Sequence, residues 1–236
     1  MLLSEREHSI FTMLFTKKFD LRFFCDELRK MQPEIEEINK AAYEYIDSCI
    51  GNIEGMPNEM LRDNEIMIQG YESSHMLEAV KELLKYGLDP NKIYSEKDKR
   101  GYYEEFNIMR ELSYVDNGYV AADTLALLLD HGGNPNLILN GESLLRNINF
   151  DISFDRLNLK NRFWYDAKVH YWMVLIGYGA KLENGKESIE PCGNFDISNL
   201  KNHRQYYYKV INYESIKDGA ELCFFDKKTH MEVVRY

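Results

Sequence analysis

A five-residue phrase ending in glycine occurs three times and decides the fold: LLKYG at 83–87, LLDHG at 128–132 and LIGYG at 175–179. The glycines at 87, 132 and 179 lie 45 and 47 residues apart by subtraction. A period of this size is typical of a stacked repeat, in which each unit buries its apolar face on its neighbour. The sequence therefore predicts a repeat architecture that offers a surface to another macromolecule.

Each copy is interpreted as the end of a helix followed by a turn. In the first copy Leu77, Val80 and Leu83 follow the three-and-four spacing of an apolar helix face. A glycine just past a helix can take the left-handed conformation that closes the last turn without a Cβ clash. The segments DPN at 89–91 and NPN at 134–136 then turn the chain, because proline fixes φ and Asp or Asn binds nearby amides. The third copy lacks the proline.

These motifs resemble the ankyrin repeat family, whose second helix ends in a leucine-rich run, a glycine and an Asp-Pro-Asn-like turn. The segment GESLLR at 141–146 is similar to a degraded form of the family's glycine and Thr-Pro-Leu-His, with Ser143 at the helix-capping position. Leu144 and Arg146 replace the family's proline and histidine, and the period exceeds the usual length of about 33 residues. The resemblance covers roughly residues 56–186. The alternative is three unrelated helix ends in an ordinary all-α domain.

The predicted fold class is all-α: an ankyrin-like helical-repeat solenoid with an N-terminal helical cap and a C-terminal β-hairpin. Residues 1–55 form the cap, residues 56–186 form about three divergent repeats, and residues 187–236 form a C-terminal helix plus the hairpin cap. Terminal units of this kind are needed because they cover the open apolar faces of the stack. We expect one continuous domain.

Local patterns place the elements within these three parts. Residues 91–100 are charged and polar and predict an exposed turn, whereas residues 102–114 and 196–212 predict helices. The β-rich runs at 221–225 and 231–236 flank a polar turn and predict a terminal hairpin.

Composition and charge exclude several classes of function. The net charge of −10 argues against nucleic-acid binding, which needs a basic face. No apolar run is long enough for a membrane span, and the N-terminus does not read as a signal peptide. The four cysteines have no CxxC spacing, so we expect reduced thiols, no zinc site and no cofactor in a cytoplasmic protein. The richness in Asn, Tyr, Lys and Ile is typical of an AT-rich bacterial genome.

No catalytic motif is present, and we expect no enzymatic activity and no catalytic residues. The six histidines are scattered, and His131, in the aromatic position before a helix-ending glycine, is interpreted as structural. The alternative is a small-molecule-binding enzyme hidden in the irregular insertions. Converging polar groups near His170, His203 and residues 151–155 would favour it.

A binding surface is the preferred interpretation. The resemblance implies that the inter-repeat turns and the first helices form the concave side that holds partners. Tyrosine and arginine are favoured at interface hot spots. For Trp164 a buried ring between helices is the alternative, and of the Tyr102–Tyr103 pair we expect one ring in the core and one exposed. The candidate partner-binding residues are Tyr94, Arg100, Tyr102, Tyr103, Asn140, Glu142, Arg146, Trp164 and Tyr165.

The functional hypothesis is a non-catalytic protein–protein interaction module whose acidic surface binds a basic partner. Charge of this kind speeds association more than it sets final affinity. A sharper version is a bacterial immunity or antitoxin protein that neutralises a basic toxin domain. A host-directed effector and a purely structural accessory protein are further alternatives.

Overall fold

A computed structural model of the chain describes residues 3–16, 18–50, 75–97, 101–115, 118–147, 159–181, 190–191, 193–211 and 221–235. The helices are α1 (Glu5–Leu14), α2 (Leu21–Met31), α3 (Ile35–Ser48), α5 (Met76–Lys85), α6 (Ile108–Leu112), α7 (Gly118–Asp130), α8 (Leu144–Asn147) and α9 (Leu159–Gly177). The strands are β1 (Tyr94–Lys97), β2 (Tyr103–Phe106), β3 (Ile138–Leu139), β4 (Glu142–Ser143), β5 (Glu190–Pro191), β6 (Tyr206–Ile211), β7 (Glu221–Asp226) and β8 (Glu232–Arg235). Two 3₁₀ helices, η3 (Ile197–Lys201) and η4 (His203–Gln205), precede β6.

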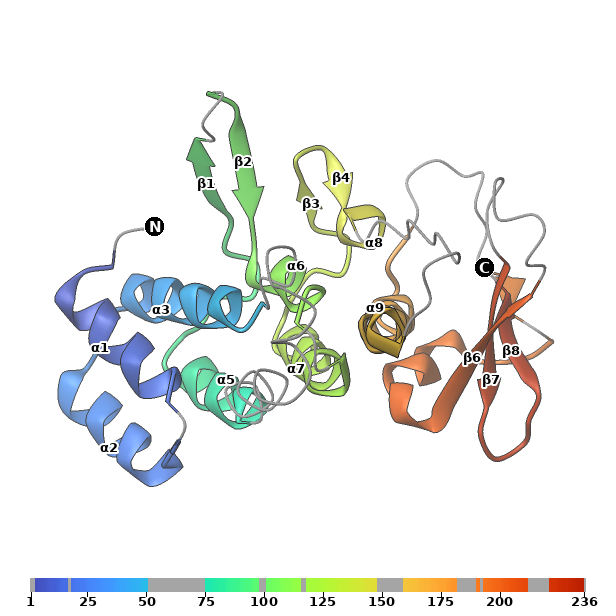
Figure 1. Ribbon diagram of the computed structural model, residues 1–236, viewed down its shortest axis with the longest axis horizontal. Coiled ribbons are helices and arrows are strands. Elements are labelled where there is room, and N and C mark those ends of the chain that lie inside the picture. The colour runs from blue at the N-terminus through green and yellow to red at the C-terminus, as the bar shows by residue number, and fades with distance from the viewer. Residues whose placement is uncertain are drawn as a thin grey trace.

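The helices in the middle of the chain form two rows (Figure 1). Helices α3, α6 and α8 make one row in which neighbours contact one another, and α5, α7 and α9 make the other. A single apolar core runs through both rows; Val80, Met109 and Leu125, for example, are fully buried. The hydroxyl of Tyr171 on α9 donates to the main-chain oxygen of Met109 on α6 at 2.6 Å, which ties the rows together inside this core.

The N-terminal helices begin where the sequence supplies caps. Ser4 and Glu7 form a reciprocal capping box at α1, and Asp20 accepts main-chain N–H bonds at the start of α2. Helix α3 begins at Ile35, two residues after Pro33. Helix α1 packs on α3, so this part of the chain covers the first end of the two rows.

The three repeated glycines have the same conformation, which confirms the predicted helix ends. Gly87, Gly132 and Gly179 have φ values of 92°, 93° and 86°. In each copy the main-chain N–H of the residue after the glycine donates to a carbonyl five residues earlier, at 2.9–3.2 Å. This is the bonding pattern of the Schellman motif, in which a left-handed residue satisfies the last carbonyls of a helix.

Asparagine side chains join successive turns. Asn91 Nδ2 donates to the Gly132 main-chain oxygen at 2.9 Å, and Asn136 Nδ2 donates in the same way to that of Gly179 at 3.3 Å. The side-chain oxygens of these two residues accept the main-chain N–H groups of Asn134 and Lys181 at 2.7 and 2.8 Å. We call this series the asparagine ladder. It holds the turns in a regular stack.

Two antiparallel hairpins project from the row that contains α6 and α8 (Figure 1). In the first, Tyr94 pairs with Phe106 at the base. Asn107 anchors that base: its side chain caps α6 and donates to the main-chain oxygens of Pro90 and Lys92. The second turns at Asn140-Gly141, whose φ values of 54° and 79° fit the tight turn that Asn-Gly favours between strands.

The C-terminal part is a four-stranded antiparallel sheet of order β5-β8-β7-β6. It lies beside α9, which η3 and η4 also contact (Figure 1). A Cβ added to Gly177 would collide with the main-chain nitrogen of Lys201, so α9 and η3 approach closely at this glycine. The sheet is therefore fastened to the helical rows by the segment that precedes β6.

The all-α prediction is wrong, because the described residues include three antiparallel sheets. Residues 91–100 were expected to be a turn but contain β1, and the helix expected at 102–114 is β2 followed by the short α6. Ser95, Glu96 and Lys97 of β1 are exposed, and the charged strands lack the alternation of apolar and polar residues that marks a half-buried strand.

The prediction of a helix at 196–212 is also wrong, because this segment forms η3, η4 and β6. Its run of Tyr206, Tyr207 and Tyr208 followed by Val210 and Ile211 is typical of a strand. The terminal hairpin is confirmed as β7 and β8, within a larger sheet than expected.

Residues 51–74, which contain the start of the predicted repeats, lie outside the described residues, as do residues 151–155. In the part of the chain that the structure describes, no helix is both long and apolar enough to cross a membrane.

Candidate protein-binding face

The two projecting hairpins and the helix row beneath them form one side of the molecule (Figure 1). We define the finger face as hairpins β1–β2 and β3–β4 together with helices α3, α6 and α8. Most of the candidate residues for partner binding belong to it: Tyr94, Tyr102, Tyr103, Asn140, Glu142 and Arg146. The structure therefore places these six candidates on neighbouring elements.

The first hairpin carries two exposed aromatic rings. Tyr102 and Tyr103 are 72% and 71% exposed. The expectation that one ring enters the core is wrong, because both rings are exposed on a hairpin that projects beyond the helices. The Lys97 ammonium lies 5.7 Å from the centre of the Tyr103 ring, a cation–π distance. These rings are accessible to a partner.

Tyr94 lies beneath the face rather than on it. Its side chain is only 8% exposed, and its ring centre lies 5.2 Å from that of Tyr43 on α3. Its hydroxyl is buried and makes no hydrogen bond. Burial raises the pKa of both phenols, and nearby carboxylates, among them Glu44, add to the effect. Tyr94 thus joins the hairpin to α3.

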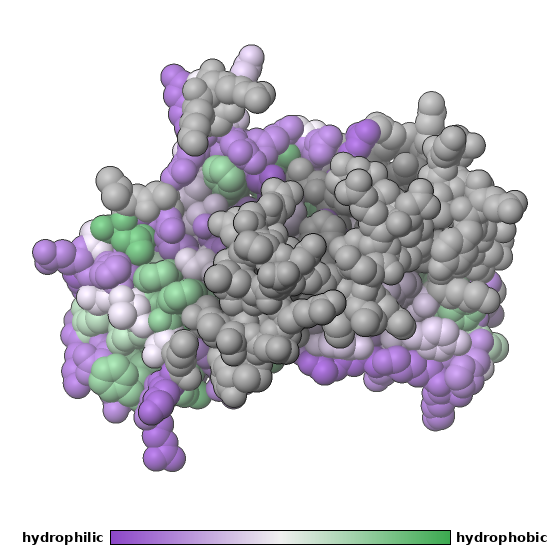
Figure 2. Space-filling view, viewed as in Figure 1, coloured by the Kyte–Doolittle hydropathy of each residue, from purple (hydrophilic) through white to green (hydrophobic). Residues whose placement is uncertain are grey.

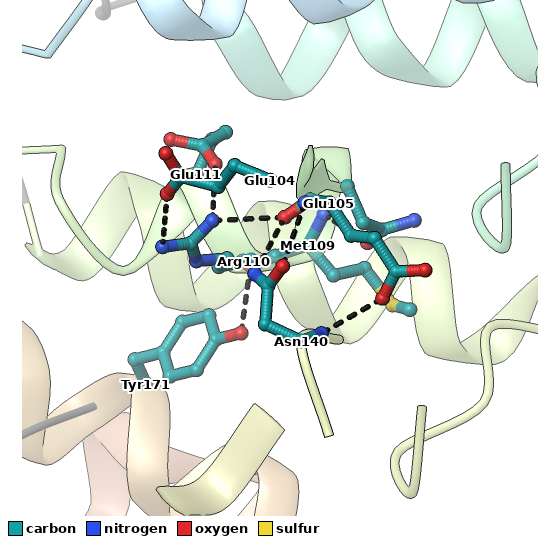
Figure 3. Close-up of polar contacts among 8 residues, drawn as sticks. Glu104, Glu105, Met109, Arg110, Glu111, Asn140 and Tyr171 are labelled. Atoms are coloured by element: carbon teal, nitrogen blue, oxygen red, sulfur yellow. Dashed lines mark hydrogen bonds and ion pairs between the residues drawn. The ribbon is translucent and has the colours of Figure 1, made fainter. Parts of the chain in front are cut away.

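The two hairpins are joined to each other by Glu105 and Asn140 (Figure 3). The Glu105 main-chain N–H donates to Asn140 Oδ1 at 2.8 Å, and the Asn140 main-chain N–H donates to Glu105 Oε2 at 2.7 Å. A third bond runs from Asn140 Nδ2 to the Glu105 main-chain oxygen at 3.1 Å. A two-stranded hairpin is marginally stable alone. These reciprocal bonds hold the two hairpins together as one unit.

Arg110 on α6 binds the first hairpin (Figure 3). Its guanidinium donates to the Glu105 main-chain oxygen at 3.0 Å and to Glu104 Oε1 at 3.3 Å. The neighbouring Glu111 carboxylate is 4.0 Å from Arg110, too far for a hydrogen bond. Glu111 is 6% exposed, and its Oε1 is buried without any hydrogen-bond partner.

The electrostatic surroundings of Glu111 are acidic. Burial raises the pKa of its carboxyl to about 7; Arg110 opposes this shift, whereas Asp47 and Glu104 add to it. Across the whole finger face, the helices and strands carry nine acidic and four basic side chains, a net charge of −5. Half of the chain's net charge of −10 therefore lies on these elements.

The remaining candidates differ in what the structure describes. Glu142 and Arg146 are exposed on β4 and α8. Arg100 lies outside the described residues, and for Trp164 and Tyr165 only the backbone within α9 is described. Ser143 immediately precedes α8, but its buried hydroxyl has no hydrogen-bond partner, so the expected N-cap bond is not made.

A second polar cluster joins α7, α9 and η4. His203 Nε2 lies 2.9 Å from Asp123 Oδ1, and His203 Nδ1 lies 3.2 Å from His170 Nδ1. Arg204 binds the same carboxylate through Nε and a terminal nitrogen, at 3.1 and 2.5 Å from Oδ2, and its guanidinium lies 5.1 Å from the centre of the Tyr119 ring. The sequence analysis singled out the two histidines but missed Asp123, which lies 47 residues before His170 on the mainly apolar helix α7.

Burial governs the ionisation of this cluster. Burial lowers the pKa of His170 to about 4, and the positive charges of its neighbours add to the effect. Burial opposes ionisation of Asp123, but hydrogen bonds from His203 and Arg204 overcome it and lower the pKa of that carboxyl to about 2. Because Asp123 already binds both partners, the cluster fastens η4 to the helices.

Among the described side chains, no group of three or more His, Cys, Asp or Glu is arranged to hold a metal ion. Phe23 on α2 and Ile35 at the start of α3 are exposed, and Figure 2 shows several hydrophobic residues over the N-terminal helices, whereas the projecting first hairpin is mainly hydrophilic.

Comparison with known proteins finds no relative for this chain. No protein-family model matches it, and neither a curated protein nor a solved structure does.

Proposed function

We propose that the finger face binds another protein without catalysis and that the partner presents a basic surface to it. The observation that carries this proposal is the pair of exposed rings of Tyr102 and Tyr103 on a projecting hairpin. Tyrosine combines a large apolar area with few rotatable bonds and a polar hydroxyl, which makes it a frequent hot-spot residue. The Glu105–Asn140 bonds support the hairpin, so less order must be gained on binding.

The charge of the finger face supports the choice of a basic partner. The helices and strands of the finger face carry a net charge of −5, which attracts a positive surface during encounter and repels acidic competitors. The ankyrin-type assignment of the repeated motif is part of this proposal, as is the sharper version of an immunity or antitoxin protein. We further propose a cytoplasmic location, which suits a reduced thiol at Cys25.

The histidine cluster gives less support to an enzyme. Asp123 Oδ1 and both ring nitrogens of His203 are already engaged in contacts within the protein. A general base needs a free nitrogen or oxygen within hydrogen-bond reach of its substrate. Structural fastening of η4 accounts for the observed contacts without a reaction.

The proposal is tested by capture from a lysate of the organism that encodes the chain. Wild-type protein is compared with the double variant Tyr102→Ser/Tyr103→Ser at low and moderate salt. Phe23→Ser is the matched control, since it removes an exposed aromatic ring from a helix away from the finger face. Captured proteins are identified by mass spectrometry, and the affinity of a captured protein is then measured directly.

We expect one basic protein whose affinity falls in the double variant, stays unchanged in Phe23→Ser, and weakens as salt rises. The proposal is wrong if the double variant binds every captured protein as wild-type does.

A further inference from the structure

The first hairpin has one edge that the fold uses and one edge that it leaves open. The Glu105 main-chain N–H and C=O both bond to the Asn140 side chain, at 2.8 and 3.1 Å, so they point away from β1 (Figure 3). Ser95 stands directly opposite Glu105 in the antiparallel register. The main-chain groups of two opposite residues point either both inward or both outward, so those of Ser95 point away from β2.

This outer edge of β1 is accessible and has unused hydrogen-bonding groups. Lys97 stands two residues after Ser95, so its main-chain groups also face outward. Ser95, Glu96 and Lys97 are exposed, and β1 lies on the side of the hairpin away from β3–β4 (Figure 1). Among the described residues, none bonds to the outward N–H and C=O groups of Ser95 or Lys97. Such an edge is a template for a further strand, and a two-stranded hairpin gains stability from a third.

The charges of the hairpin select the kind of strand that fits this edge. Strands β1 and β2 carry three acidic and one basic side chain, a net charge of −2. Glu96 and Glu104 lie directly opposite each other, and a positive neighbour relieves the repulsion between such a pair. Arg110 is a neighbour of this kind on the β2 side, at 3.3 Å from Glu104. A third strand would place a cationic side chain beside Glu96 on the β1 side.

We propose that the outer edge of β1 receives an extended basic segment of the partner protein as a third strand. This inference rests on the proposed function and names how the finger face holds its partner. Lysine or arginine at alternate positions of the segment would lie on the face of Glu96 and Glu104. The residues between them would lie on the face of Lys97 and Tyr103 and be uncharged. A second copy of the chain is repelled, because its edge carries the same Glu96.

The test uses the full chain and two synthetic heptapeptides of equal charge. The first probe alternates lysine with threonine, and the second has the same residues in two separate blocks. Main-chain amide resonances measured by NMR report where each probe binds and how tightly. The comparison of the two probes on wild-type protein depends on no variant.

Two variants at Ser95 test the main-chain pairing. Ser95→Pro removes the outward N–H, whereas the bonds between β1 and β2 do not involve this group. Ser95→Thr is the matched control, because it keeps the N–H and favours a strand. Amide exchange of Glu104 and Phe106, whose N–H groups face β1, checks that each variant keeps its hairpin.

We expect the alternating probe to shift the amide resonances of Ser95 and Lys97 and to slow the exchange of these amides. Ser95→Pro should bind this probe at least about tenfold more weakly, and Ser95→Thr should bind it as wild-type does. The block probe should bind both wild-type and Ser95→Pro weakly.

Three results would overturn the inference. The first is a set of Ser95 and Lys97 amides that the alternating probe leaves unchanged. The second is equal binding, either of the two probes to wild-type or of the alternating probe to wild-type and to Ser95→Pro with an intact hairpin. The third is a dimer of wild-type chains that Ser95→Pro abolishes, because a second copy would then occupy the edge.

The outcome is separable from that of the proposed function. If Tyr102→Ser/Tyr103→Ser loses the captured partner while Ser95→Pro keeps it at full affinity, the finger face binds a protein and the third strand is wrong. If only Ser95→Pro loses it, the third strand is supported and the role of the two rings is wrong. If both variants keep the partner at full affinity, the proposed function itself is wrong. If both lose affinity while Phe23→Ser and Ser95→Thr do not, both proposals are supported.

Discussion

The side-chain oxygen of Asn91 accepts the main-chain N–H of Asn134 at 2.7 Å, although the two residues are 43 positions apart. The same amide group donates to the Gly132 main-chain oxygen at 2.9 Å. One side chain thus satisfies both a donor and an acceptor of the next turn. The Asn91 amide therefore joins two turns in the way that a pair of main-chain hydrogen bonds joins two strands of a sheet.

Replacing this amide should lower stability. Asn91→Ala removes both bonds and leaves two main-chain groups of the next turn to water, so we expect the free energy of unfolding to fall by about 1–3 kcal/mol. Asn194→Ala, at an exposed asparagine after β5, is the control and should change stability by less than about 0.5 kcal/mol. Urea denaturation followed by circular dichroism measures both. Equal stability of the two variants would contradict a role for the asparagine ladder.

Two glycines near the end of α9 should respond differently to alanine. Gly179→Ala meets no atom within 4 Å, but its φ of 86° strains an L residue, at a cost of about 1–2 kcal/mol. Gly177→Ala places its methyl group against the main chain of Leu200 and Lys201, which cannot yield as a flexible side chain can.

We therefore expect Gly177→Ala to displace η3 from α9. Hydrogen exchange should report loss of protection in β6 and β7 for this variant, whereas Gly179→Ala should keep that protection. Native protection of the sheet in Gly177→Ala would show that the contact with η3 is not required.

Stability should depend on pH through His170. Its pKa is about 4 in the folded protein and has the ordinary value of 6.5 when unfolded, so the unfolded chain binds a proton first as pH falls. Above pH 6.5 neutral His170 therefore costs no free energy of unfolding. Between pH 6.5 and about 4 the free energy of unfolding falls, by a total on the order of 3 kcal/mol. His170→Gln should remove most of this dependence. Denaturation midpoints of wild-type and His170→Gln, measured across this pH range, test the prediction. Identical pH profiles for the two proteins would contradict it.

The two hairpins should lose their coupling when Glu105 is truncated. Glu105→Ala removes the carboxylate that accepts the Asn140 main-chain N–H, so we expect this amide to exchange with solvent at least about tenfold faster. Glu104→Ala is the matched control: it removes a carboxylate from the same strand that binds Arg110 instead of the second hairpin. Amide exchange measured by NMR compares the two. Equal exchange rates would mean that the hairpins are not joined through this side chain.

The sequence predicted the repeated helix ends well, because a left-handed glycine and an Asx-Pro turn are local signals. Gly87, Gly132 and Gly179 each need no information from elsewhere in the chain to end their helices. The run from Tyr206 to Ile211 also carried a local strand signal, and the error there was one of interpretation.

Other features depend on contacts that sequence spacing does not encode. The β1–β2 hairpin contains Glu96, Glu104 and Glu105, residue types that favour helices over strands. It holds its shape through Asn107 at its base and Asn140 in the neighbouring hairpin. Likewise, Glu111 Oε1 receives no hydrogen bond because the Arg110 guanidinium is directed toward the first hairpin, which no local pattern reveals.

The asparagine ladder also limits how many units can stack. Asn91 and Asn136 stand four residues after their glycines, and the sequence places Glu183 four residues after Gly179. A carboxylate has oxygens to accept an N–H but no N–H to give to a carbonyl. A further unit added behind the third turn would therefore find only half of the bond pair that aligned the earlier ones.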